Sequence, residues 1–179
     1  NEVFKADLAK VATSLKQLQS EGIAVIWRPF HEAAGGWFWW GKDADSCKKL
    51  WIAMFDYFKS QGVNNLIWVW TSESDDSSWY PGDEYVDIIG RDLYSKNTSD
   101  CASIYQSEFA RYGHKVIALS ECGKVGLLSA QWSAGARWAW FMPWYGKADS
   151  GSKHATDEWW KDAMGQTYVI TRDQVPSMK

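Results

Sequence analysis

The chain has 179 residues, of which 46% are hydrophobic and 23% are charged, and its formal net charge at pH 7 is -3. This composition is typical of a globular protein and excludes an intrinsically disordered chain. No apolar run approaches the ~20 residues that span a bilayer, and the slight acidity offers no basic surface to a phosphate backbone. We therefore expect no membrane span and no nucleic-acid partner.

Helices and strands are expected to alternate along the chain. Apolar residues at helical spacing predict a helix from Phe4 to Leu18, and the β-branched run 23–30 predicts a strand covered on both faces. Four further strands are predicted at 66–72, 86–94, 116–121 and 138–144. The helices between and after them are expected at 45–61, from a cap at Ser99 or Asp100 to Gly113, between Gly126 and Gly135, and around Trp159 and Trp160.

This alternation is typical of a parallel α/β architecture, either an open doubly wound sheet or a (β/α) barrel. Polar and aromatic residues gather at the carboxyl ends of the predicted strands, where a TIM barrel places its chemistry. No glycine-rich phosphate loop follows any strand, which argues against an open nucleotide-binding sheet. Five strands cannot close an eight-stranded barrel, so we expect about three β/α units to be missing.

Aromatic residues make up 16% of the chain and include 14 Trp. Tryptophan is large and seldom fully buried, so we expect some of these rings to line a surface or a cleft. Flat apolar rings with a polar edge suit the faces of sugars. An aromatic core is the alternative interpretation, and for any single Trp it is the more common one.

Two glutamates, Glu32 and Glu121, end apolar strands and are flanked by small residues. Glycoside hydrolysis uses two such carboxyls, one protonated to assist the leaving oxygen and one ionised to attack or to activate water. A single strand-end glutamate is often the buried partner of an arginine, for which Arg28 and Arg91 are candidates. His31 either tunes Glu32 or is a core histidine. Together with the Trp-rich loops, the two carboxyls favour an enzyme.

Other catalytic chemistries find little support in the sequence. Cys47, Cys101 and Cys122 lie far apart without metal-ligand spacing, and the three histidines form no HExxH pattern. We therefore predict no catalytic metal and no cofactor, and the spacing of the cysteines implies no disulfide framework. Ser120 lacks the context of a hydrolase nucleophile, and no histidine partner for Cys122 is fixed by the sequence.

The segment 28–41, Arg-Pro-Phe-His-Glu-Ala-Ala-Gly-Gly-Trp-Phe-Trp-Trp-Gly, resembles glycoside hydrolase family 26. Members of this family are mostly endo-acting β-mannanases in which a histidine precedes the acid/base glutamate. The segment 79–94 is similar to the sixth-strand region of the family, and 119–123 is similar to its nucleophile segment. The resemblance therefore extends over most of the chain.

For the fold, the resemblance implies a (β/α)8 TIM barrel of which residues 1–179 supply strands four to eight only. Glu32 would end strand four and Glu121 strand seven, which agrees with our count of strands. The first three β/α units would be missing, and a missing N-terminal segment or a second chain would complete the barrel. The protein would be secreted, or held at the cell surface or in the periplasm.

For the activity, the resemblance implies a retaining endo-β-1,4-mannanase that hydrolyses mannan, glucomannan or galactomannan by double displacement. Its ligand would be a β-mannan polysaccharide or a manno-oligosaccharide. Glu32 would be the acid/base and Glu121 the nucleophile. Four further side chains would support these two or bind the sugar. His31 would support Glu32, Tyr94 would hydrogen-bond Glu121, and the rings that stack on sugar would be Trp37 and Trp144.

Two alternatives stay open at this point. The first keeps the mechanism but acts on β-1,3-xylan or mixed-linkage β-glucan, as relatives of this family do. The second is a non-catalytic carbohydrate-binding protein that uses its tryptophans as a platform. The two strand-end carboxylates argue against the second, because a binding platform has no need of them.

Overall fold

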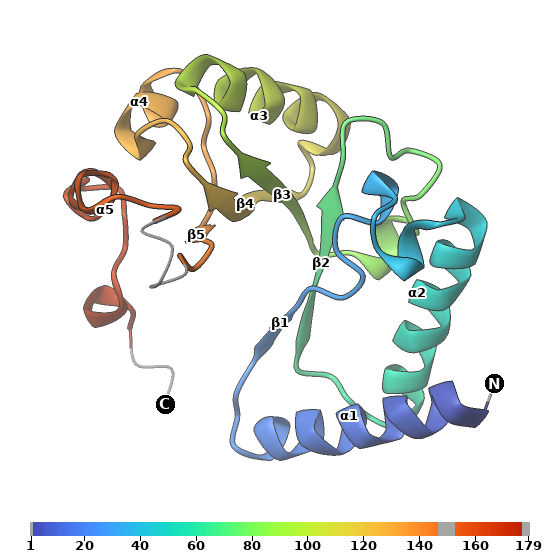
Figure 1. Ribbon diagram of the computed structural model, residues 1–179. Helices are drawn as coiled ribbons and strands as arrows, with labels where there is room; N and C mark the ends of the chain where they lie inside the picture. The colour runs from blue at the N-terminus through green and yellow to red at the C-terminus, as the bar shows by residue number, and fades with distance from the viewer. Residues whose placement is uncertain (1, 147–152, 177–179) are drawn as a thin grey trace. The chain divides into compact units, whose positions relative to one another are not determined.

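The computed structural model describes residues 2–146 and 153–176 (Figure 1). The chain divides into two compact units, residues 1–91 and 92–179. The strands pair in chain order, β1-β2-β3-β4-β5. The strand β3 (Ile88–Tyr94) contains the boundary between the units, so that it begins in the first and ends in the second.

The first unit is built from two helices and the strands that follow them. Its elements before β3 are α1 (Glu2–Ser20), β1 (Val25–Trp27), α2 (Ala44–Ser60) and β2 (Leu66–Ser72). The helix α1 packs against α2 (Figure 1). The pairing of β1 with β2 and of β2 with β3 is parallel. The carboxyl ends of these strands therefore point the same way.

An aromatic core fixes α2 against β2. The side chain of Asp43 caps α2 by accepting a hydrogen bond from the Ser46 amide, and the helix buries one stripe of apolar residues. Within that stripe the fully buried Trp51 meets Trp68 and Trp70 of β2, with ring centroids 5.7 and 5.3 Å apart. This packing holds β2 in place, and with it the residues that follow the strand.

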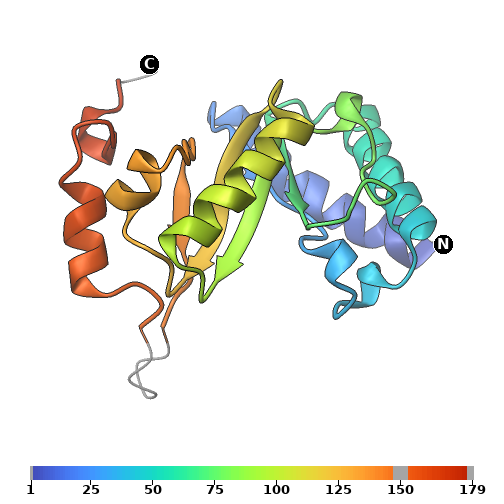
Figure 2. The ribbon, with the colours of Figure 1, turned by 90° about the horizontal axis from the view of Figure 1, so that it is seen from above.

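The second unit continues the alternation. Its elements after β3 are α3 (Thr98–Tyr112), β4 (Val116–Gly123), α4 (Leu128–Ser133), β5 (Phe141–Pro143) and α5 (Asp157–Met164). Figure 2 shows α3 lying along β4, which it contacts. The strands β4 and β5 are parallel, with a shift of register between Leu119 and Cys122. The predicted α/β alternation is confirmed, whereas the numbering of the strands as four to eight of a barrel stays a prediction.

Three details of the sequence prediction are wrong. The first strand is shorter than the predicted 23–30 and is not covered on both faces, since Ile26 is 54% exposed. The reason is that β1 has only β2 as a neighbour in the described part of the chain. The cap of α3 is Asn97, whose side chain accepts from the amide of Asp100. The last strand is only Phe141–Pro143, although Ala139 and Trp140 before it already form backbone hydrogen bonds with β4.

None of the helices in residues 2–146 and 153–176 is long and apolar enough to cross a membrane.

Candidate active site

The loop after β1 holds Glu32 in an uncommon backbone conformation. Both Phe30 and Glu32 lie in the left-handed region, with φ of 49° and 54°. Residues other than glycine rarely adopt this region, and such strain, about 1–3 kcal/mol for each residue, is typically retained at functional sites. The half-buried side chain of Glu32 is therefore presented by a strained loop.

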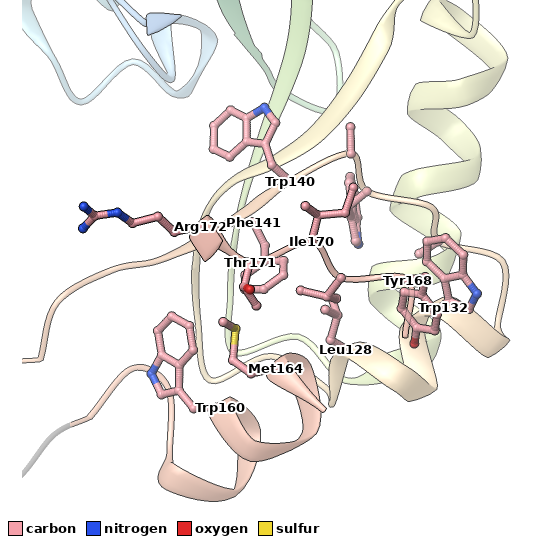
Figure 3. A pocket seen from close by; sticks show the side chains of 14 residues that line it. Leu128, Trp132, Trp140, Phe141, Trp160, Met164, Tyr168, Ile170, Thr171 and Arg172 are labelled. Carbon is pink, nitrogen blue, oxygen red and sulfur yellow. The ribbon is translucent and has the colours of Figure 1, made fainter. Parts of the chain in front are cut away.

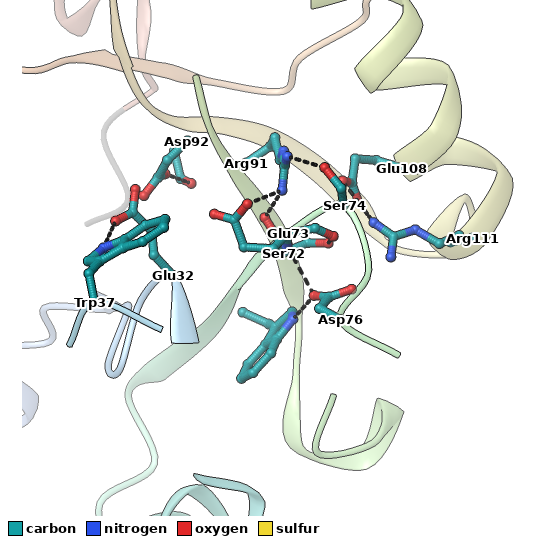
Figure 4. Close-up of polar contacts among 12 residues, drawn as sticks. Glu32, Trp37, Ser72, Glu73, Ser74, Asp76, Arg91, Asp92, Glu108 and Arg111 are labelled. Carbon is teal, nitrogen blue, oxygen red and sulfur yellow. Dashed lines mark hydrogen bonds and ion pairs between the residues drawn. The ribbon is translucent and has the colours of Figure 1, made fainter. Parts of the chain in front are cut away.

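An indole fixes one oxygen of this carboxylate. The Nε1–H of Trp37 donates to Oε2 of Glu32 at 3.0 Å (Figure 4). The ring of Trp37 covers Gly35 so closely that a Cβ at that glycine would lie 2.1 Å from the indole. Because Trp37 is also 59% exposed, one edge of its ring binds Glu32 while much of its surface stays accessible. Such a ring can pack against a sugar.

His31 is surrounded by aromatic rings of the same loop. Its ring lies 4.8 Å from that of Phe38 and 5.9 Å from that of Trp40, measured between centroids. The Nε1–H of Trp40 donates to the carbonyl of His31 at 2.9 Å. These contacts fix the backbone next to Glu32. The predicted support of Glu32 by the His31 side chain itself stays a prediction.

The two arginines considered as partners of a strand-end glutamate both contact the end of β2 or the segment after it. The Nη1 group of Arg28 donates to Thr71 at 3.2 Å. Arg91 is buried, and its guanidinium donates to the Ser72 carbonyl, to Glu73 at 3.0 Å and to Ser74 at 3.1 Å (Figure 4). Arg91 therefore connects β3 with the segment after β2, a structural role that the sequence did not reveal.

In the second unit, Glu121 lies in β4 and is only 6% exposed. The phenol of Tyr94, the last residue of β3, donates to Oε1 of Glu121. A hydrogen bond to a carboxylate is stronger than one between neutral groups and fixes the direction of the acceptor. The hydrogen bond expected of Tyr94 is thus present, while the catalytic roles of both residues stay predictions.

Next to Glu121, a second buried carboxylate is paired. The hydroxyl of Ser120 donates to Oδ1 of Asp92 at 2.6 Å, and both residues are buried. Sequence reasoning assigned Asp92 no role, although two consecutive charged residues, Arg91 and Asp92, inside a mostly apolar strand are a signal that could have found it. Ser120 is a hydrogen-bond donor here, and the view that it is not a nucleophile stays a prediction.

The three cysteines are free and buried. Burial raises the pKa of Cys47 and of Cys101 to about 11. Burial also raises the pKa of Cys122 to about 12, with smaller contributions from Cys101 and from the carboxylates beside it. A thiol with so high a pKa is protonated at neutral pH and is a poor nucleophile. Cys122 is therefore a poor candidate for nucleophilic catalysis.

Strained residues also follow β3 and β4. Both Ser95 and Lys124 have φ of 53°, and the Ser95 amide donates to the Gly123 carbonyl at 2.9 Å. In the described ranges, the non-glycine residues with positive φ are these two together with Phe30 and Glu32, and all of them follow a strand. Side chains of these types have no preference for the left-handed region, so the sequence carried no signal of it.

Trp144 follows β5 and has an anchored backbone with an accessible ring. Its amide donates to the Cys122 carbonyl at 2.8 Å, and its ring is 39% exposed. The ring lies 5.2 Å from that of Tyr145, which is also exposed. The predicted stacking of Trp144 on a sugar stays a prediction that this exposure permits.

A cavity of about 380 Å³ in the second unit lies apart from these residues. Its walls come from α4, β5, α5 and the segment 168–172, and they include Trp132, Trp140, Trp160 and Met164 (Figure 3). None of the predicted site residues lines it. Because it contains none of these residues, this cavity is separate from the candidate site.

The fold is parallel α/β, one glutamate follows a strand and another lies within a second strand, and an aromatic side chain donates to each. This arrangement is the one expected of an α/β glycoside hydrolase. A family model described as Glycosyl hydrolase family 26 matches residues 1–174. The chain belongs to this family, and the resemblance seen in its sequence is confirmed.

Relatives share both sequence and fold with the chain. The mannan endo-1,4-beta-mannosidase of Thermothelomyces thermophilus is 37% identical over 173 residues, which cover 94% of this chain and 35% of that protein. An endo-beta-mannanase/endo-beta-glucanase of Prevotella bryantii has a TM-score of 0.90 at 44% identity, over 98% of this chain and 29% of its own. A beta-mannanase from a symbiotic protist of the termite Reticulitermes speratus, complexed with gluco-manno-oligosaccharide, has a TM-score of 0.83 at 42% identity, over 96% of this chain and 54% of its own. The chain thus spans about a third of the curated relative.

Proposed function

We propose that the full-length protein is a retaining endo-β-1,4-mannanase that acts on mannan, glucomannan or galactomannan. The observation that carries the proposal is the aromatic hydrogen bond to each glutamate, from Trp37 to Glu32 and from Tyr94 to Glu121. Each bond orients one carboxylate, that of Glu32 in the loop after β1 and that of Glu121 within β4, in a chain that belongs to family 26. The names of its relatives, which include mannan endo-1,4-beta-mannosidase, support the choice of substrate.

The proposed reaction proceeds in two displacements. In the first, Glu121 attacks the anomeric carbon while Glu32 gives its proton to the glycosidic oxygen, so that the bond to the leaving sugar breaks. In the second, Glu32 takes a proton from water as the water attacks the same carbon, and the ester bond to Glu121 breaks. The proposal requires the two carboxyls to lie about 5–5.5 Å apart in the full-length protein.

The remaining predicted residues have supporting roles in this reaction. The phenol of Tyr94 holds Glu121 in the direction of attack, and His31 supports Glu32 from the preceding position. The exposed rings of Trp37 and Trp144 stack on sugar at the cleavage site. The roles of Tyr94 and of the two tryptophans are supported by the hydrogen bond and the exposure described above, and the role of His31 by the family resemblance.

We also propose that this chain contributes strands four to eight of a (β/α)8 barrel. The chain spans only 35% of a curated relative's length. In the first unit the edge strand β1 leaves Ile26 exposed, and in the second unit an apolar cavity lies beside β5. Three further β/α units, from an upstream segment or a second chain, would cover such surfaces. Because a polysaccharide does not cross a membrane, we propose a secreted, cell-surface or periplasmic location.

The test uses the full-length protein with an activated aryl mannobioside. Glu121→Ala is expected to lose hydrolysis of both mannan and this substrate, and azide should rescue it as the α-mannosyl azide. Glu32→Ala with azide should instead give the β-azide, because the nucleophile is still present and inverts the centre first. The matched control is Glu21→Ala, at an exposed position after α1, which should behave as the wild type. Wild-type hydrolysis by Glu121→Ala would end the proposal.

The choice of polysaccharide has its own experiment. Reducing-sugar release is measured on mannan, mixed-linkage β-glucan and β-1,3-xylan with the same wild-type enzyme. Fastest release from mannan is expected, whereas faster release from either other polymer would keep the mechanism and change the substrate. Retention in an affinity gel without release from any polymer would identify a carbohydrate-binding protein instead.

A further inference from the structure

His154 lies against the pair formed by Tyr94 and Glu121 in the second unit. The rings of His154 and Tyr94 meet edge to face, with centroids 5.4 Å apart and planes at 78°. The backbone of the same residue is anchored, because the amide of Lys124 donates to the His154 carbonyl at 2.6 Å. The segment before α5 is thus tied to the residue that directly follows β4.

Gly123 provides the space for this contact. A Cβ at Gly123 would lie 2.3 Å from Nδ1 of His154 and 2.7 Å from Cδ1 of Tyr94. Real Cβ atoms do not approach other atoms so closely, so any side chain at this position would push the two rings away. The absence of a side chain at the end of β4 therefore allows His154 and Tyr94 to pack together.

The contact between the two residues is made by the rings. Within the described residues, Nδ1 of His154 is buried and has no hydrogen-bond partner. A buried nitrogen without a partner reduces stability, and a phenyl ring of similar size would fill the space without this penalty. Nδ1 therefore contributes no hydrogen bond to the contact. His154 acts on Tyr94 only through van der Waals packing of its ring.

We propose that His154 is a positioning residue for the nucleophile. Its ring limits the rotation of the Tyr94 ring, and the phenol of Tyr94 then holds Glu121 in the direction of attack. This inference rests on the proposed function, in which Glu121 is the nucleophile. Because small misplacements of a reacting group can reduce a rate about 100-fold, loss of the His154 ring is expected to lower kcat about ten-fold and to leave KM little changed.

A double-mutant cycle in the full-length protein tests the inference. The variants are His154→Ala, Tyr94→Phe and the two combined, and kcat and KM are measured on mannan. If His154 acts through the Tyr94 phenol, His154→Ala lowers kcat about ten-fold alone but causes no further loss in the Tyr94→Phe background. Equal losses in both backgrounds, or no loss in either, would overturn the proposal.

Two further variants separate positioning from folding. His154→Phe keeps a ring at this position, and it is expected to retain most of the wild-type kcat with an equal or higher Tm. If His154→Ala does not fold, His154→Leu replaces it in the cycle. A loss of kcat only when the Tyr94 phenol is present would again support the proposal, and equal losses in both backgrounds, or no loss in either, would overturn it. His114→Ala, at an exposed histidine before β4, is the matched control and should keep the wild-type kcat.

Failure of this inference is distinguishable from failure of the proposed function. Wild-type hydrolysis by Glu121→Ala would overturn both. An inactive Glu121→Ala with equal losses in the two arms of the cycle would overturn only the role of His154.

Discussion

Replacing Gly35 with Ala is expected to displace the indole of Trp37 from Glu32. The new Cβ would lie 2.1–2.5 Å from three atoms of the indole, whereas ordinary contact begins at 3.4 Å, so the ring must move by about 1 Å or more. Gly35 itself has no positive φ, so alanine is compatible with the backbone. The hydrogen bond of 3.0 Å from Trp37 to Glu32 would be lost.

The size of the effect follows from that hydrogen bond. A hydrogen bond to a charged group contributes about 1.5–3 kcal/mol, which corresponds to a loss of about 10–100-fold in kcat/KM if the bond is needed in the transition state. The assay is the steady-state hydrolysis of mannan by the full-length variant. Trp37→Phe, which keeps the ring without its N–H, should show a similar loss, and the two substitutions together should cost little more than one.

Gly22→Ala is the matched control for this prediction. Gly22 has φ of 72°, and a Cβ at this position would have no atom within 4 Å, so its replacement reports backbone strain alone. It should lower Tm without changing kcat, since Gly22 precedes β1 whereas the loop that holds Glu32 follows the strand. Wild-type kcat/KM in Gly35→Ala would refute the reasoning that the indole bond orients Glu32.

Two further predictions concern titrating groups. Because burial raises the pKa of Cys122 to about 12, its thiolate fraction at pH 8 is about 10⁻⁴. Iodoacetamide should therefore label this thiol only after denaturation, which peptide mass spectrometry checks. Rapid labelling of the native protein would contradict the prediction. The Ser46 hydroxyl and amide lower the pKa of the Asp43 side chain from 3.8, so this cap stabilises α2 above that pH and its contribution is lost as pH falls through the lowered pKa. Asp43→Ala should therefore have a lower Tm than the wild type at pH 7 and the same Tm at strongly acid pH. A Tm difference that does not change with pH would contradict this.

Local patterns were sufficient to predict some elements and not others. The strand β2 begins and ends where the sequence predicted, at Leu66 and Ser72, because a continuous apolar run there is bounded by polar residues. The cap of α3 was displaced because residues 97–100, Asn-Thr-Ser-Asp, are all good N-caps, and the helix begins after the first of them. Burial of β1 could not be predicted locally, since it depends on the elements that pack beside the strand.

The candidate site shows the same limit. Glu32 and Glu121 were found from their positions at strand ends, and the link from Tyr94 to Glu121 came from the family resemblance. The packing of Trp37 over Gly35 was missed, because it depends on the path of a loop whose strained residues have no sequence signal. Contacts between residues far apart in sequence, such as that of His154 with Tyr94, have no local pattern at all.

The contacts that orient each glutamate are local, and this separates two requirements of the proposed reaction. Trp37, five residues after Glu32, fixes that carboxylate within the first unit, and Tyr94 fixes Glu121 within the second. The distance between the carboxyls has no such local determinant, because Glu32 and Glu121 belong to different units. A retaining mechanism is sensitive to that distance. Substitutions at the local contacts should therefore change catalysis in the full-length protein by misdirecting one carboxyl at a time, without acting on the distance between the two.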